Sequence, residues 1–268
     1  MRNLYEKIKG RLQFVFYRVC TWIFSYKRVG NGSISFIMRT STSNEMHRAL
    51  TLTTKEPETV AWIDGFSFPP DQGAVFYDVG ANVGLYSLYA KARHPDLKIY
   101  CFEPEAQSFA SLCQNIVINQ FANIIPYQFA ISDSEGLGNL FVSSMYAGAG
   151  AAALGSAYSF SRAKAAPLIQ GVFKMSLDLL VQQEGLPIPN YLKIDVDGIE
   201  QKILQGAKSV LSDLRLFGVL IEFQFVDRAD LTAAFALLEE CGLKLKLTSE
   251  WVAEFDDFKS QNFIFERM

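Results

Sequence analysis

The sequence predicts an α/β fold in which parallel strands alternate with helices. Short, continuous apolar runs of strand length recur from residue 74 onward, and segments with the apolar spacing of helices follow them. Half of the residues are hydrophobic, which suffices for a large core, and only 20% are charged, so disorder is not expected over most of the chain. The length of 268 residues fits one large domain with an N-terminal extension better than two independent domains.

Charge and cysteine content narrow the class of protein. The net charge of −3 offers no general attraction to nucleic acid, whose phosphates need a basic face, so no nucleic-acid partner is expected. The four cysteines are scattered and lack the paired spacing of a zinc site or a disulfide framework. We therefore expect a reducing compartment, with the cytoplasm as the default location.

Residues 1–54 are predicted to form an N-terminal helical extension. Basic side chains in residues 1–28 surround an apolar, aromatic run from Leu12 to Tyr26, which is too short to span a membrane and is interrupted by Arg18. Two interpretations stay open for this segment. It forms a helix lying in a membrane interface, which would make the protein membrane-peripheral, or it packs on the domain's own core or on the partner in a homodimer.

The clearest ligand-binding pattern begins at residue 74. Residues 74–79 form a buried strand, a glycine-containing turn follows, and residues 85–92 form a helix. Gly80 permits a sharp turn, Gly84 allows the close approach of a ligand or of neighbouring backbone, and Asn82 tolerates a left-handed conformation better than most residues. This order places backbone N–H groups and a helix N-terminus at the end of a strand, as in Rossmann-like nucleotide-binding domains.

Acidic residues follow the next two strands. The predicted strand over residues 97–102 ends in Glu103, and the one over residues 124–130 ends close to Asp133. Glu103 lies about 20 residues beyond the glycine turn, where an acid accepts hydrogen bonds from both ribose hydroxyls. We expect Asp133 to accept a hydrogen bond from an adenine amino group and Ile131 to contact the ring face. Either acid alone could be a solvated loop carboxylate, but acids at successive strand ends favour a nucleotide ligand.

Charge then distinguishes between two candidate cofactors. NAD would use the same layout, but its motif has a glycine where Asn82 stands, and Asp78 lies two residues before the turn. A carboxylate beside a pyrophosphate would be repelled, whereas one beside the sulfonium and amino group of S-adenosylmethionine (SAM) would be attracted. SAM is therefore the predicted cofactor, and an NAD-dependent oxidoreductase is a weaker alternative.

These motifs resemble those of the FkbM-type methyltransferases. The resemblance spans residues 55 to about 225, and one departure is Asp197, where the family usually carries a glutamate. The matching segments, as they stand in this sequence, are Lys55-Glu56-Pro57-Glu58-Thr59, Phe76-Tyr77-Asp78-Val79-Gly80-Ala81-Asn82-Val83-Gly84-Leu85-Tyr86-Ser87, Cys101-Phe102-Glu103-Pro104, Ala130-Ile131-Ser132-Asp133, Ser176-Leu177-Asp178 and the run from Leu192 to Glu200.

The resemblance has implications for fold, activity and site. It implies a Rossmann-like, seven-stranded, mostly parallel sheet flanked by helices, with the methyltransferase domain over residues 55–268. It also implies SAM-dependent O-methylation, often of a sugar or another hydroxyl compound. Together with the strand-end analysis, it completes the predicted cofactor site, whose residues are Glu56, Asp78, Gly80, Asn82, Gly84, Glu103, Ser132, Asp133 and Asp195.

The predicted strand over residues 191–196 contains the candidate chemical centre. Lys193 and Asp195 project to the same face, and burying both is costly unless they are paired or lie at the carboxyl end of the strand. Glu222 ends the next strand and should lie close to Asp195. We predict Asp195 as the base or acceptor-orienting group, Glu222 as the second candidate and Lys193 as a pairing partner. Alternatively, Asp195 and Glu200 only hold the SAM amino group and the loop.

Two further questions concern metal ions and histidines. Three carboxylates converging at this place could bind a divalent cation through oxygen ligands, but no metal site is predicted. The chain has only two histidines, His47 and His94. A catalytic histidine is not expected, although His47 is left open.

Residues 143–173 are rich in alanine, glycine and serine and are too long for an ordinary connection. They form either a functional lid or binding loop, or a disordered insertion beside a small hairpin near residues 140–142. The side chains that would stack on or hydrogen-bond a sugar-like acceptor are Tyr146, Tyr158, Phe160 and Arg162.

The sequence as a whole predicts a SAM-dependent methyltransferase that acts on a hydroxyl oxygen of a sugar, a glycan or another small molecule. The main alternative is a non-catalytic scaffold of the same fold at a membrane surface, which the basic and aromatic residues 1–28 motivate. A nucleic-acid methyltransferase is weaker, because the fourth strand is not followed by an Asn-Pro-Pro-aromatic block and the overall charge is acidic.

Overall fold

The fold comes from a computed structural model. It describes residues 25–68, 73–150, 152–155, 167–224, 228–249, 252–254 and 258–267. Most of the segment predicted as a basic, aromatic helix, residues 1–24, lies outside the described residues. None of the described helices combines the length and the apolarity that crossing a bilayer requires.

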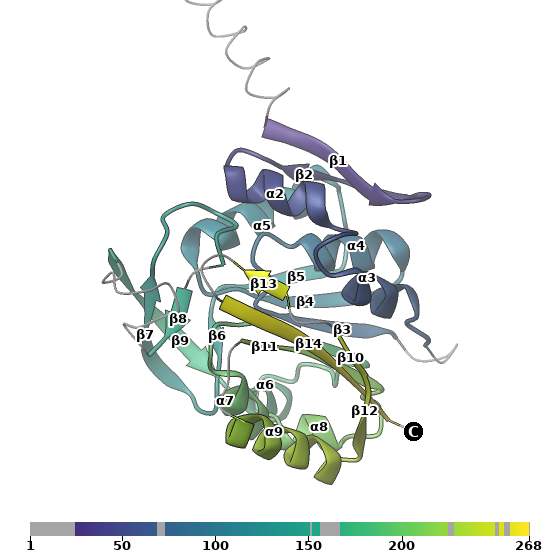
Figure 1. Cartoon of the computed structure of the whole chain (residues 1–268), viewed down its shortest axis with the longest axis vertical. Helices are drawn as coiled ribbons and strands as arrows, with labels where there is room; N and C mark the ends of the chain where they lie inside the picture. The colour runs from purple at the N-terminus through teal and green to yellow at the C-terminus, as the bar shows by residue number, and fades with distance from the viewer. Residues whose placement is uncertain are drawn as a thin grey trace, which may run out of the picture.

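A mostly parallel sheet forms the centre of the molecule and confirms the predicted fold class (Figure 1). Its strand order is β12-β14-β11-β10-β3-β4-β5, with β14 antiparallel to both neighbours and the short β13 paired to its end. The strands are β3 (Val75–Val79), β4 (Lys98–Phe102), β5 (Ile124–Tyr127), β10 (Tyr191–Ile194), β11 (Gly218–Gln224), β12 (Leu243–Thr248), β13 (Val252–Glu254) and β14 (Phe258–Arg267).

Helices cover both faces of this sheet, and the alternation of side chains along β3 explains why. Tyr77 and Val79 point into the core on one face, and Phe76 points into the core on the other. All five residues of β3 are buried, as expected for a central parallel strand. The helices on the Phe76 face are α3 (Pro57–Asp64), α4 (Leu85–Arg93) and α5 (Ala106–Ile118), and those on the Tyr77 face are α6 (Leu177–Gln182), α7 (Glu200–Gln205), α8 (Lys208–Ser212) and α9 (Arg228–Glu240).

A second, smaller sheet lies beside the main one (Figure 1). The segment expected as one strand over residues 124–130 divides, because β5 ends at the edge of the main sheet and the chain then enters the small sheet. Pro126 lacks an N–H and is tolerated in an edge strand. The strands of the small sheet, in spatial order, are β6 (Ala130–Ile131), β9 (Leu168–Met175), β7 (Gly136–Val142) and β8 (Ala152–Leu154).

The N-terminal extension is only partly helical, which corrects the prediction for residues 1–54. Strands β1 (Tyr26–Asn31) and β2 (Ile34–Arg39) form an antiparallel hairpin, and α2 (Ser43–Thr51) follows. Gly32 and Ser33 form the two-residue turn between the paired residues Asn31 and Ile34, and Gly32 has a φ of +61°, which glycine adopts readily. Phe36 and Met38 alternate into the core with the period of a strand, which the basic and aromatic composition before them obscured.

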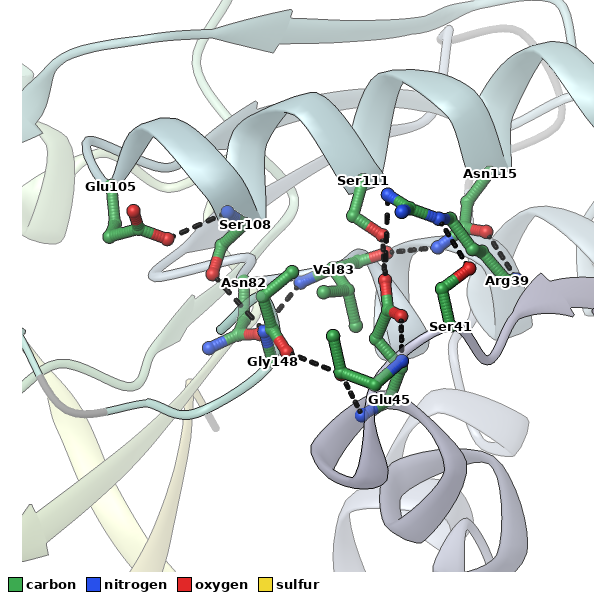
Figure 2. Close-up of polar contacts among 12 residues, drawn as sticks. Arg39, Ser41, Glu45, Asn82, Val83, Glu105, Ser108, Ser111, Asn115 and Gly148 are labelled. Carbon is green, nitrogen blue, oxygen red and sulfur yellow. Dashed lines mark hydrogen bonds and ion pairs between the residues drawn. The ribbon is translucent and has the colours of Figure 1, made fainter. Parts of the chain in front are cut away.

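The hairpin is bound to α5 through asparagine side chains. Asn119 accepts from the N–H of Ile37 and donates to its carbonyl, both at 2.7 Å. Asn115 is fully buried; it accepts from the N–H of Arg39 at 2.7 Å and donates to the carbonyl of Val83 at 2.8 Å (Figure 2). The free edge of β2 is thus satisfied by side chains, and the hairpin packs in the same core as α4 and α5. The division of the chain at residue 54 stays a prediction.

Candidate active site

A cavity of about 450 Å³ opens where β3, β4, β10 and β11 end at the same edge of the sheet. Parallel strands deliver their carboxyl ends to one side, which is where α/β sheets bind ligands. The lining includes five residues that the sequence predicted for the site: Gly80, Asn82, Glu103, Asp195 and Glu222. The volume lies in the range of pockets that hold small molecules and cofactors.

The turn after β3 has the conformation that its residue types predicted. Gly80 and Gly84 have φ values of +80° and +88°, and Asn82 has a φ of +52°. A Cβ at Gly80 would lie 1.8 Å from the carbonyl oxygen of Asp195, so only glycine fits between β3 and β10 there. A Cβ at Gly84 would lie 2.5 Å from Cδ1 of Leu112 on α5. The glycines therefore bring the turn, β10 and α5 into close contact at the cavity edge.

Glu103 connects the end of β4 to this turn. Its Oε2 accepts a hydrogen bond from the N–H of Asn82, and its Oε1 accepts one from the N–H of Glu105, both at 2.8 Å. The side chain is buried, and this burial raises the pKa of Glu103 to about 8, against the two backbone hydrogen bonds, which lower it. A carboxylate has lone pairs beyond these two contacts, so Glu103 can still accept hydrogen bonds from a ligand in the cavity.

A pair of carboxyl groups from β10 and β11 lies at another part of the lining. Asp195 and Glu222 follow the paired residues Ile194 and Ile221, and their side chains share a hydrogen bond. Lys193, which is only 1% exposed, places Nζ 2.5 Å from Oδ2 of Asp195. The Asp195 carboxylate thus contacts the Glu222 carboxyl group through a hydrogen bond and the buried Lys193 ammonium through an ion pair.

The two carboxyl groups differ in protonation. Burial raises the pKa of Asp195, but the Lys193 ammonium and the hydrogen bond from Glu222 outweigh burial and hold that pKa well below its usual value. Burial and the negative charge of Asp195 raise the pKa of Glu222 well above its usual value. The proton that the pair shares therefore lies on Glu222, which donates it to the Asp195 carboxylate.

Comparison with known proteins identifies the family. The family model described as "Methyltransferase FkbM domain" matches residues 78–245, which is more than half of the chain. The chain belongs to the FkbM methyltransferase family. The strand-end motifs had predicted this family.

Individual relatives match parts of this FkbM-family methyltransferase. The 31-O-demethyl-FK506 methyltransferase FkbM of Streptomyces tacrolimicus is 40% identical over 65 residues, which are 24% of this chain and 25% of that protein. The hexuronic acid methyltransferase AglP of Haloferax volcanii is 27% identical over 179 residues, 66% of each chain. The chain therefore covers about a quarter and just under two thirds of these relatives. Among solved structures, the magnesium protoporphyrin IX methyltransferase ChlM of Synechocystis PCC 6803 is similar with a TM-score of 0.48 and 12% identity, over 89% of this chain and 87% of that one.

Two acids of the FkbM-family site lie beneath the cavity surface and do not line it. Asp78 is 1% exposed; its Oδ2 accepts from Ser87 at 2.5 Å, and its Oδ1 accepts no hydrogen bond from any described residue. Burial raises the pKa of Asp78, although Lys193, its register partner on β10, lowers it. Glu56 is also buried, and its carboxylate lies 3.4 Å from Nζ of Lys55. Both acids surround the Lys193 ammonium, and their predicted contacts with SAM stay predictions.

The acid predicted after the third strand, Asp133, does not lie at the cavity, unlike the acids at the carboxyl ends of β4, β10 and β11. Asp133 is exposed, accepts from Ser134 at 2.9 Å, lies 4.0 Å from Lys174 and does not line the cavity. Ser132 is buried outside the lining as well. Ile131 does line the cavity, and its contact with a ring face stays a prediction. The adenine contact of Asp133 stays a prediction that the cavity does not support.

Helix α2, which precedes residue 55, contributes to the site; the sequence analysis had left only His47 of this helix open as a candidate. Asn44, His47 and Arg48 of α2 line the cavity, and so do residues of the strap, which we define as residues 144–150. The strap includes Tyr146, a predicted acceptor contact; the other three predicted there, Tyr158, Phe160 and Arg162, lie outside the described residues. In the part of the chain that the structure describes, no three His, Cys, Asp or Glu side chains are grouped so as to hold a metal ion.

Proposed function

We propose that this protein transfers the methyl group of SAM to a hydroxyl oxygen of a sugar, a glycan or another small molecule. The observation that carries the proposal is the ionised Asp195, paired with Glu222 and Lys193, in the lining of a cavity beside the glycine turn. Two relatives support the acceptor class by their names, which specify a 31-O-demethyl compound and a hexuronic acid.

The cavity residues fit the cofactor. Gly80 lines the cavity without a side chain, so the turn presents backbone there, and Glu103 presents a carboxylate that retains acceptor capacity. We assign the ribose hydroxyls to Glu103 and the apolar contact with adenine to Ile131 and Phe102. When bound, SAM supplies an electrophilic methyl group on its sulfonium.

The proton of the acceptor is then taken up by this chain. As the hydroxyl oxygen bonds to the methyl carbon, its proton becomes strongly acidic and passes to Oδ of Asp195. A carboxylate of low pKa suffices because the proton leaves late, when the oxygen already carries positive charge. Glu222 and Lys193 hold Asp195 in one orientation, so that its carboxylate would orient the acceptor hydroxyl for the transfer.

Contacts of residues 1–28 with a membrane or with a second copy stay predictions, as does the cytoplasmic location. Residues 1–24 lie outside the described part of the chain, and nothing in the described part favours the non-catalytic scaffold.

A label-transfer screen tests the proposed function. Purified protein is incubated with methyl-labelled SAM and panels of sugars, uronic acids, glycans and hydroxylated metabolites, and products are analysed by mass spectrometry. We expect the label on oxygen of at least one acceptor, and much slower label transfer by the Asp195→Asn protein. Label on nitrogen or carbon, or no transfer by protein that binds S-adenosylhomocysteine (SAH), would contradict the proposal.

The protonation of Glu103 predicts a pH-dependent affinity for the cofactor. Ribose hydroxyls donate to the ionised form, whereas burial raises the pKa of Glu103 to about 8, so below this pH a proton competes with the ligand. Below about pH 8 we expect the affinity for SAH to rise with pH, by up to about tenfold per pH unit. Above about pH 8 the affinity should level off. Calorimetric titration between about pH 6.5 and 9 measures this.

Two substitutions show whether Glu103 is responsible. Glu103→Gln removes the titrating group and should give weaker binding with a flat pH profile. Glu184→Gln makes the same chemical change at an exposed position outside the cavity and should keep the wild-type profile. An unchanged pH dependence in the Glu103→Gln protein would refute the assignment.

A further inference from the structure

Helix α2 forms one wall of the cavity, although it lies before residues 78–245, which match the family. A capping box fixes its start, because Thr42 accepts from the N–H of Glu45 at 3.1 Å while Glu45 accepts from the N–H of Thr42 at 2.9 Å. Glu45 is fully buried and accepts from Ser111 of α5 at 2.5 Å (Figure 2). The helix is thus held firmly on α5 and positions Arg48, three residues after Glu45, at the cavity.

The strap orients the side chain of Arg48. Its Nε donates to the carbonyl of Gly148 at 2.7 Å. The N–H of Gly148 in turn donates to Ser108 of α5 at 3.4 Å (Figure 2). Gly150 has a φ of +61°, and a Cβ there would lie 2.8 Å from Nη2 of Arg48 and 3.7 Å from Nδ2 of Asn82. The guanidinium therefore lies between the strap and the glycine turn, and its Nε is occupied by a backbone carbonyl.

The charges around Arg48 indicate what it binds. Five carboxyl side chains line the cavity, yet among the described residues none forms an ion pair with Arg48. Lys55, the other cation of the lining, lies 3.4 Å from Glu56. The planar guanidinium fork matches a carboxylate through two parallel hydrogen bonds, and such bonds are strong where water is restricted. The five carboxyl residues are Glu103, Glu105, Asp195, Asp197 and Glu222.

We propose that Arg48 binds a carboxylate of a ligand in this cavity. The inference rests on the proposed function, because it takes the cavity as the place where SAM and the acceptor meet. Two sources can supply the group: the amino-acid part of SAM, and an acidic acceptor such as a uronic acid. Both would bring a carboxylate beside the glycine turn.

The variant Arg48→Gln tests the proposal with little disturbance of the strap. The Nε2 of glutamine lies the same number of bonds from the backbone as the Nε of arginine, so it can still donate to Gly148, while the charged fork is removed. Arg93→Gln is the matched control, because Arg93 is exposed on α4, pairs with Asp64 and does not line the cavity.

Calorimetry then uses three probes: SAH, 5′-methylthioadenosine, which is the same nucleoside thioether without the amino-acid part, and D-glucuronate added to SAH-saturated protein. If the carboxylate is that of the cofactor, Arg48→Gln should weaken SAH binding by about tenfold to a hundredfold and leave methylthioadenosine binding unchanged. If it is that of the acceptor, both nucleosides should bind as before, and glucuronate binding to the wild type should be lost in the variant.

Two other outcomes of the calorimetry would overturn the proposal, and a third would contradict the proposed function. The proposal is overturned if neither SAH nor glucuronate binding depends on Arg48, or if methylthioadenosine binding falls as much as SAH binding, since that would report a general change of cavity shape. Failure of the wild-type protein to bind either nucleoside would contradict the proposed function itself, and the role of Arg48 with it.

Discussion

Replacing Asp195 with asparagine is expected to lower kcat by about a hundredfold or more, because the acceptor proton then has no carboxylate to receive it. The side chain keeps its size, and Lys193 retains Asp78 and Glu56 nearby, so the fold should survive. Affinity for SAH should change far less than kcat. Single-turnover transfer to an acceptor from the label screen measures the rate, and thermal melting checks the fold.

Glu222→Gln provides the comparison for Asp195→Asn. A glutamine amide can donate to Asp195 much as the protonated Glu222 does, so this variant should retain most of the activity. Similar losses in the two variants would mean that the pair acts as a unit rather than through Asp195. Full activity of the Asp195→Asn protein would remove Asp195 from the reaction.

Gly80→Ala is expected to have the largest effect on stability. The new Cβ would lie 1.8 Å from the main-chain oxygen of Asp195, and alanine at a φ of +80° is strained before any clash is counted. The clashing atom belongs to the backbone at the end of the central strand β10. The clash can therefore be removed only if β3 and β10 move apart. We expect a loss of about 3 kcal/mol or more in the free energy of unfolding, together with loss of SAH binding.

Chemical denaturation measures the effect of Gly80→Ala, and Gly171→Ala is its control. Gly171 lies in β9 of the small sheet, with nothing within 4 Å of an added Cβ. That variant should unfold at the wild-type denaturant concentration. A Gly80→Ala protein as stable as the wild type would show that the turn can move away from β10.

The parts of the site that the sequence predicted are those with local causes. The residue types glycine and asparagine predicted the turn conformation at Gly80 and Asn82. Asp195 and Glu222 were expected to lie together because neighbouring parallel strands end at one edge of the sheet. These conclusions need only strand order and residue chemistry. Asp133 was a weaker case, since its place depended on the chain continuing in the main sheet, which it leaves after Tyr127.

What the sequence did not reveal depends on contacts between distant segments. Arg48 reaches the cavity because α2 docks on α5 and meets the strap, about a hundred residues further along. No local pattern around Arg48 distinguishes it from a solvated helix residue. The hairpin over residues 26–39 has a glycine in its Gly32-Ser33 turn, but the aromatic and basic residues before it favoured a helix.

The asparagine contacts between β2 and α5 have a practical consequence for anyone shortening this protein. A chain cut at residue 55, the predicted start of the methyltransferase domain, would leave the inward amides of Asn115 and Asn119 facing water and Ser111 without Glu45. It would also remove Arg48 and leave the cavity open on the side that α2 covers. The smallest fragment that retains the intact cavity must therefore begin before Tyr26.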